Sequence, residues 1–176
     1  GQKDTDVNED PDAKSPEVEI LNISNNSLTS KDIFSLEKFP NLVDFNARSN
    51  DIRTVPAGIE YFTKIQRLDL SNNNIVTLKG VDSLTTLIRL NCGKNRIELL
   101  PDKFGNLQKL KYLRCGANNL NKMKSITDLS NLVELDLSSN KLTKVPGSIR
   151  NLIKLERLEL NNNKLTALPT EIGAIT

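Results

Sequence analysis

The stretch LVELDLSSNKL, residues 132–142, decides the fold. Leu132, Leu135, Leu137 and Leu142 are apolar, polar residues alternate with them in the middle of the stretch, and Asn140 follows two serines. Alternation with a period of two is typical of a strand that buries one face. A unit this small cannot bury its apolar face alone, so it must pack on further copies of itself.

Six further copies of this pattern lie along the chain. All seven fit L-x-x-L-x-L-x-x-N-x-L, with Val, Ile, Phe, Ala or Cys at some apolar positions, and they occupy residues 18–28, 42–52, 65–75, 87–97, 110–120, 132–142 and 155–165. The spacings between successive Asn residues are 24, 23, 22, 23, 22 and 23. Self-similarity with a nearly fixed period predicts a stacked repeat architecture.

The pattern resembles the leucine-rich repeat family, and the resemblance covers residues 18–176. It implies a right-handed leucine-rich repeat solenoid of the α/β class, with a parallel β-sheet on the concave face and short helical, 3-10 or irregular turns on the convex face. We expect seven repeats. We also expect a truncated C-terminus, because the sequence breaks off within a convex segment without the polar cap that terminal repeats need.

The segments between repeats come in two versions. One carries Pro in a V/L-P-x-x-I/F pattern, as at Val55-Pro56 and Val145-Pro146, and is similar to repeats of Ras suppressor protein, Scribble and the Shoc-type Ras scaffolds. The other, LKGVDSL and MKSITDL, lacks Pro and is similar to repeats of protein phosphatase-1 regulatory subunits. Both resemblances imply an intracellular 22/23-residue repeat type. They place the protein in the cytoplasm, with the nucleus as the alternative.

Residues 1–17 contrast with the repeats. They carry six acidic residues against two lysines, and residues 1–16 have only Val7 and Ala13 as apolar side chains. Such a segment cannot offset its ordering entropy through burial, so we expect a disordered acidic tail or linker.

Composition excludes several kinds of chemistry. The chain has no His, which removes the commonest general base and metal ligand, so we expect neither a cofactor nor a metal site. It has no glycine-rich phosphate-binding loop, and paired carboxylates on an open solenoid face lack the closed cleft that raises a catalytic pKa. The sequence therefore predicts a protein that is not an enzyme. No run of about eighteen apolar residues is present, so we expect no membrane insertion.

The two cysteines, Cys92 and Cys115, occupy the same inward position of adjacent repeats. We expect buried free thiols that pack as small apolar side chains. The alternative is a disulfide, because equivalent positions of neighbouring strands lie within bonding reach. The seven repeat Asn residues are expected to be structural, with each buried amide bonding backbone groups of its own and the next repeat.

Outward strand residues are the candidate binding surface. In repeats two to five this set holds six cations and two anions, whereas repeats six and seven hold four anions and one cation. Paired Arg donors grip acidic or phosphorylated groups, and Tyr and Arg are enriched among interface hot spots. The candidate protein-binding residues are Arg48, Arg67, Asp69, Arg89, Asn91, Lys94, Lys111, Tyr112, Arg114 and Asp136. The competing interpretation is a set of solvated charges that keep the sheet soluble.

The sequence thus predicts a non-catalytic scaffold or adaptor that binds a protein partner on its concave face, in intracellular signalling. The alternative is a recognition or regulatory segment of a larger signalling enzyme, such as a kinase, GTPase, cyclase or ubiquitin ligase. Nucleic acid is the least favoured partner, because the basic excess is modest and aromatic residues for base stacking are scarce. The oligomeric state stays open.

Overall fold

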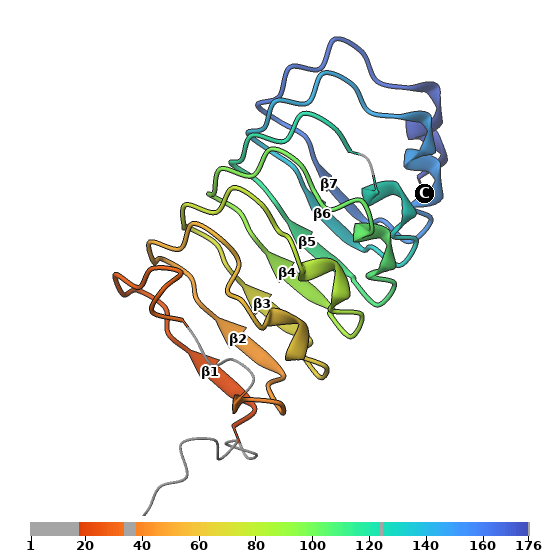
Figure 1. Ribbon diagram of the computed structural model, residues 1–176. Helices are drawn as coiled ribbons and strands as arrows, with labels where there is room; N and C mark the ends of the chain where they lie inside the picture. The colour runs from red at the N-terminus through yellow and green to blue at the C-terminus, as the bar shows by residue number, and fades with distance from the viewer. Residues whose placement is uncertain (1–17, 34–37, 124, 176) are drawn as a thin grey trace, which may run out of the picture.

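The computed structural model describes residues 18–33, 38–123 and 125–175. Seven parallel strands form one open sheet in chain order, so every strand pairs with the strand of the next repeat (Figure 1). The strands are β1 (Ile20–Asn22), β2 (Asp44–Asn46), β3 (Arg67–Asp69), β4 (Arg89–Asn91), β5 (Tyr112–Arg114), β6 (Glu134–Asp136) and β7 (Arg157–Glu159). The expected acidic tail, residues 1–17, lies outside the described residues.

The register of the sheet follows the repeat pattern. Leu68 pairs with Leu90, Leu90 with Leu113, and Leu113 with Leu135, so equivalent positions of adjacent repeats stand side by side. A slip of one residue would carry every apolar side chain to the other face of the sheet, which is why the buried face fixes the register.

The connecting segments on the other side of the coils form 3-10 turns, and no α-helix occurs in the described residues. The turns are η2 (Ile59–Tyr61), η3 (Val81–Ser83), η4 (Phe104–Asn106), η5 (Ile126–Asp128), η6 (Gly147–Asn151) and η7 (Thr170–Ala174). Pro146 and Pro169 directly precede η6 and η7, whereas Gly80 and Ser125 enter the turns of the Pro-free segments with left-handed backbones. The predicted solenoid with a parallel sheet and short 3-10 turns is confirmed. None of the helical turns in the described part of the chain has the length and apolar character to cross a membrane.

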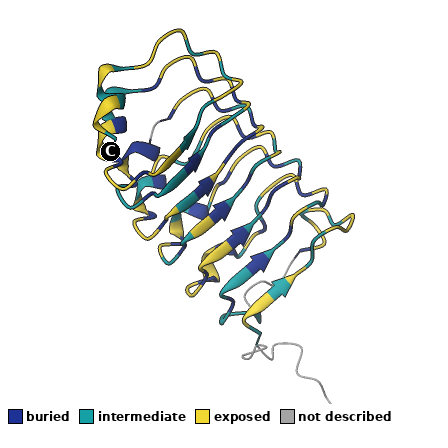
Figure 2. Cartoon of the chain, turned by 180° about the vertical axis from the view of Figure 1, so that it is seen from behind, coloured by how far each residue is buried: buried dark blue, intermediate teal, exposed yellow. Residues whose placement is uncertain are grey.

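The core lies between the sheet and the 3-10 turns and runs along the whole array (Figure 2). Inward side chains of the middle repeats are fully buried, as at Leu90, Leu113 and Leu135. Phe45 of β2 packs edge-on against Phe62, with ring centroids 5.6 Å apart. At the two ends the equivalent residues, such as Leu21 and Leu158, are only partly buried, because each has a neighbouring coil on one side only.

The repeat Asn residues form a ladder that joins successive coils. Asn118 is typical: its Nδ2 donates to the carbonyls of Cys115 and Cys92 at 3.0 Å, and its Oδ1 accepts the Ile97 N–H at 3.0 Å. The structural role was predicted correctly, but its direction was wrong. The side-chain amide bonds its own coil and the preceding coil, not the next one.

The residue before each ladder Asn has a left-handed backbone. The φ values of Asn25, Ser49, Asn72, Lys94, Ala117, Ser139 and Asn162 lie between 53° and 57°. This conformation aims the next residue, the ladder Asn, into the coil. Lys94, a candidate binding residue, therefore sits at a turn and not on a strand.

Candidate binding surface on the sheet

Two columns of outward side chains cross the sheet, one at the start and one at the end of each strand. The first column contains Ile20, Asp44, Arg67, Arg89, Tyr112, Glu134 and Arg157. The second contains Asn22, Asn46, Asp69, Asn91, Arg114, Asp136 and Glu159. Arg67 pairs with Arg89 in register, and Arg89 pairs with Tyr112, as the sequence predicted.

The two columns line a shallow hollow of about 280 Å³ over β2 to β5, which we call the strand hollow. Its lining residues are Asp44, Asn46, Arg67, Leu68, Asp69, Arg89, Leu90, Asn91, Tyr112 and Arg114. Six of the ten candidate residues meet here. The surface is open and recessed, which suits an extended segment of a partner more than an enclosed small molecule.

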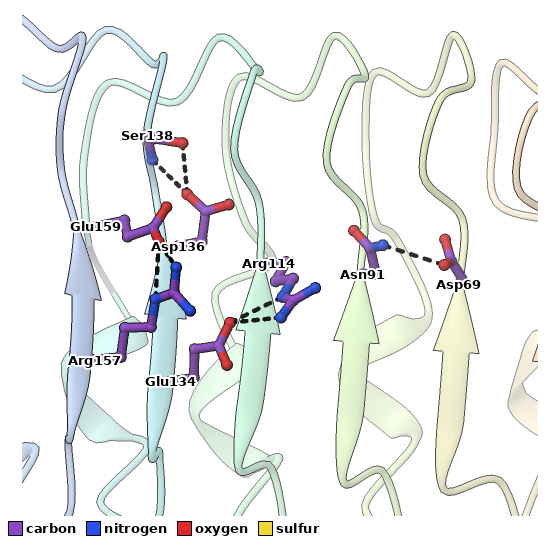
Figure 3. A network of polar contacts seen from close by, with 8 residues as sticks. All are labelled: Asp69, Asn91, Arg114, Glu134, Asp136, Ser138, Arg157 and Glu159. Carbon is purple, nitrogen blue, oxygen red and sulfur yellow. Dashed lines mark hydrogen bonds and ion pairs between the residues drawn. The ribbon is translucent and has the colours of Figure 1, made fainter.

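Two of the three arginines in the strand hollow are held by carboxylates. Arg67 Nε lies 2.7 Å from Asp44 Oδ2 on the neighbouring strand. Arg114 contacts Glu134 Oε1 through Nε and Nη2, each at 2.9 Å (Figure 3). Both arginine side chains remain about half exposed, at 47% and 55%, so solvent screens these pairs and each contributes at most about 1 kcal/mol. Their main effect is to orient the guanidinium groups and to offset their charge.

Arg89 is different from the other two. Its Cζ lies 3.8 Å from the centroid of the Tyr112 ring, a stacked cation–π arrangement across β4 and β5. Within the described residues Arg89 makes no ion pair, and its side chain stands exposed between the Arg67 and Arg114 pairs. The ring holds the guanidinium flat while its N–H donors stay available.

The acidic and amide residues of the second column have a local structural role that the sequence interpretation missed. Ser71 donates its backbone N–H and its hydroxyl to Asp69 Oδ1, at 2.8 and 2.6 Å. Ser138 does the same to Asp136 Oδ1, as Figure 3 shows. Asn22, Asn46 and Asn91 likewise accept the N–H of the residue two positions on. Asp or Asn stands here in five of the seven repeats, a signal of a turn-forming side chain that the sequence already carried.

Arg114 and Glu159 replace that turn-forming side chain in repeats five and seven. Arg114 reaches Glu134 instead, and Arg157 contacts Glu159 on its own strand (Figure 3). Contact with Glu159 raises the pKa of Arg157 above its ordinary value. Asp69 is committed further, because Asn91 Nδ2 donates to its Oδ2 at 3.1 Å. The side chains of Asp69, Asn91 and Asp136 thus already make hydrogen bonds that stabilise the turns and the sheet surface, which leaves them less available to a partner.

A second hollow of about 360 Å³, the turn hollow, lies where the strands end and the chain turns. It brings Arg48, Lys94 and Asp136 together and shares Asn91 and Arg114 with the strand hollow. Gly93 and Gly116 form part of its floor, and a Cβ on Gly116 would lie only 2.8 Å from Asp136 Oδ2. Of the ten candidates only Lys111 lines neither hollow.

The charge of the strand hollow is more balanced than the sequence count of six cations and two anions in repeats two to five implied. Three arginines and two aspartates line the strand hollow, and Glu134 of the acidic half neutralises Arg114 of the basic half. Within the described strands, the stacked Arg89 is the arginine without a carboxylate partner. No group of Asp, Glu or Cys in the described residues has the arrangement to hold a metal ion.

Family models match three parts of the chain. A model described as Leucine Rich repeats (2 copies) matches residues 130–171, and a model described as Leucine Rich Repeat matches residues 17–39 and 64–87. The chain therefore contains leucine-rich repeats, and its fold is the leucine-rich repeat solenoid.

Several solved structures resemble this solenoid. An internalin of Listeria monocytogenes is 27% identical, with a TM-score of 0.81 over 89% of this chain and 45% of its own. A leucine-rich repeat protein of Leptospira interrogans is 28% identical, with a TM-score of 0.68 over 90% of this chain and 46% of its own. The ectodomain of the Arabidopsis thaliana membrane receptor kinase GASSHO1/SCHENGEN3, solved in complex with Casparian strip integrity factor 2, is 30% identical. Its TM-score is 0.82 over 91% of this chain and 20% of its own.

The chain spans less than half the length of each of these three solved chains. Leucine-rich repeat solenoids are generally protein–protein interaction modules, typically without catalytic activity, and the matching family models indicate no catalytic family. The similarity to Ras suppressor protein, Scribble and phosphatase regulatory subunits is not confirmed by these comparisons and stays a prediction.

Proposed function

We propose that the protein is a scaffold or adaptor for intracellular signalling, and that it binds an extended, acidic or phosphorylated segment of a partner protein on the sheet. The observation that carries this proposal is the exposed Arg89 guanidinium, stacked on Tyr112 inside a hollow. A planar guanidinium with available donors binds a carboxylate or phosphate through two parallel hydrogen bonds. The stack holds the group in place before the partner arrives, which lowers the entropy lost on binding.

Arg67 and Arg114 have supporting roles in this proposal. Each has one carboxylate neighbour and a half-exposed guanidinium, so a partner's anion can share the group without displacing Asp44 or Glu134. The acidic side chains of β6 and β7 set the direction of the segment, because complementary charge fixes register more than it adds affinity. A solved complex of the plant ectodomain supports a binding role for such a solenoid.

An intracellular location, with the cytoplasm favoured, is part of the same proposal. Its support is the pair of free buried thiols, Cys92 and Cys115, which is typical of a reducing compartment. The alternative function is a recognition segment of a larger signalling enzyme. This chain spans only 45% and 20% of two similar solved chains, and this supports the alternative. The full-length reading frame would decide between the two functions.

Affinity capture from cell lysate tests the proposal with single substitutions. Arg89→Gln removes the stacked charge and keeps a polar, though shorter, side chain, and Arg150→Gln, an exposed position on η6 away from the sheet, is the matched control. We expect Arg89→Gln to lose about 30-fold in affinity for the captured partner, the loss typical of a hot spot worth about 2 kcal/mol, and Arg150→Gln to bind like the wild type.

Phosphatase treatment of the lysate separates the two kinds of anion. A partner lost after treatment carries a phosphate, and one retained presents carboxylates. If all three proteins, shown to be equally folded, capture the same partners with the same affinity, the sheet surface is a solvated face and the proposal is wrong.

A further inference from the structure

The two cysteines form a pair inside the array. Cys92 follows Asn91 of β4 and Cys115 follows Arg114 of β5, and these preceding residues are partners in the sheet register. The Cys92 N–H donates to the Arg114 carbonyl at 2.8 Å, which continues the pairing of the two strands, so Cys92 and Cys115 stand side by side. Both side chains are fully buried, and their Sγ atoms lie 3.0 Å apart.

The backbone geometry suits a covalent bond between these residues. Neighbouring strands of a sheet lie about 4.8 Å apart, inside the range of about 4.4–6.8 Å that Cα atoms span in disulfides. Both side chains point from adjacent coils into the interior of the array, on the same face of the sheet. A displacement of roughly 1 Å would bring the sulfurs to a bonding distance of about 2.05 Å.

We propose that Cys92 and Cys115 are an oxidation site, at which a small peroxide converts the two thiols to a disulfide that links repeats four and five. One thiolate attacks the peroxide, and the O–O bond breaks to leave a sulfenic acid and hydroxide. The second thiol then attacks the sulfenic sulfur, the S–S bond forms and water leaves. Overall, two thiols and one hydrogen peroxide give one disulfide and two waters.

Burial makes this reaction slow. The neighbouring Cys92 thiol, and then burial, raise the pKa of the Cys115 thiol well above its ordinary value of 9.0. Because only the thiolate reacts, the rate is low near neutral pH and rises about tenfold per pH unit below that pKa. The oxidant reaches the pair through local opening of a coil, which repeat arrays permit because each coil contacts only its neighbours.

The position of the pair gives the bond a consequence for the surface above it. Asn91 and Arg114, the residues that precede the two cysteines, line both the strand hollow and the turn hollow. Gly93 and Gly116, which follow them, lie on the floor of the turn hollow. A disulfide would therefore link the two strands covalently at the point where the hollows meet. The proposal itself does not depend on what binds there.

The first test is oxidation of the folded protein by hydrogen peroxide at pH 8. We expect a product lighter by two hydrogen atoms, with no thiol left to react with iodoacetamide after unfolding, and a Cys92–Cys115 link in the peptide map. Cys92→Ala is the control, since the equivalent inward position of repeat two is a buried alanine, Ala47. In that variant no intrachain link can form. If the folded wild type keeps both thiols, or forms only dimers or higher oxides, while the urea-unfolded chain forms the link, the proposal is overturned.

The second test asks whether the fold accommodates the bond. The disulfide closes a loop between residues 23 positions apart. A link that the native structure accepts restricts the unfolded chain, so we expect the unfolding equilibrium constant of the oxidised protein in urea to be at least tenfold smaller than that of the reduced protein. An oxidised protein that unfolds at lower urea than the reduced one would show that the native geometry opposes the bond, and would overturn the proposal.

Discussion

At the scale of single residues, the most demanding position is the one before each ladder Asn. A left-handed backbone costs about 1–2 kcal/mol for most residues with a Cβ, and Asn tolerates it better through local hydrogen bonding. Repeats one, three and seven place Asn there, whereas repeat five places Ala117, which is exposed and makes no compensating side-chain bond among the contacts described. Repeat five therefore carries strain at this residue.

Ala117→Gly should stabilise the protein by about 0.5 kcal/mol. Glycine removes the strain of the left-handed conformation, and this gain exceeds the roughly 0.4–1 kcal/mol of extra entropy that glycine gives the unfolded chain. Urea unfolding followed by circular dichroism measures the change. Ala57→Gly is the control, because Ala57 is exposed and does not have a positive φ, so glycine there should destabilise. Shifts of the same sign at both positions would contradict the argument.

At the scale of elements, the Asn ladder joins successive coils in addition to the sheet. Asn118→Ala removes three hydrogen bonds in a buried site and leaves the Ile97 N–H without its amide partner, while the Cys92 and Cys115 carbonyls keep the amides of Asn95 and Asn140. Each net hydrogen bond contributes about 1 kcal/mol, and a buried unsatisfied group costs about 1–3 kcal/mol. We therefore expect Asn118→Ala to lower the free energy of unfolding by about 3 kcal/mol.

Asn26→Ala in repeat one is the matched comparison for Asn118→Ala. Asn26 is exposed, and among the described residues its amide bonds only the carbonyls of Ile23 and Ser24 in its own coil. Chemical denaturation of the two variants should give a loss below about 1 kcal/mol for Asn26→Ala, since water replaces the lost bonds. Equal losses at both sites would mean that the ladder stabilises each turn separately and does not join coils.

The elements also show how far sequence reasoning reached. The repeat pattern predicted the strands, their register and the neighbours Arg67, Arg89 and Tyr112, because each depends on which motif positions align. It left open whether the arginines pair across strands with Asp44 or Asp69, and it did not predict that Arg114 contacts Glu134 or that Arg89 stacks on Tyr112. Long side chains choose among several neighbours within reach, and that choice depends on rotamers and small shifts between strands. The direction of the Asn ladder was wrong for a similar reason, because spacing alone places the turn near both adjacent coils.

At the scale of the whole molecule, each coil contacts only its neighbours, so stability should vary along the array. Inward residues of the middle repeats are fully buried, whereas Leu21 of β1 and Leu158 of β7 are partly exposed. In such an array the end coils have one stacking interface and the middle coils have two. Opening of an end coil therefore costs less free energy than opening of a middle coil.

Native-state hydrogen exchange measures this gradient directly. We expect the amides of Leu90 in β4 and Leu113 in β5 to exchange only on global unfolding, and those of Leu21 in β1 and Leu158 in β7 to exchange at least about 100-fold faster, because end coils open locally. Leu113→Ala should then raise exchange throughout β4 to β6, while Leu21→Ala should affect β1 and β2 alone, since interactions pass only between adjacent coils. Uniform protection from β1 to β7 would instead show that the seven repeats unfold as one cooperative unit, with the end coils as stable as the middle.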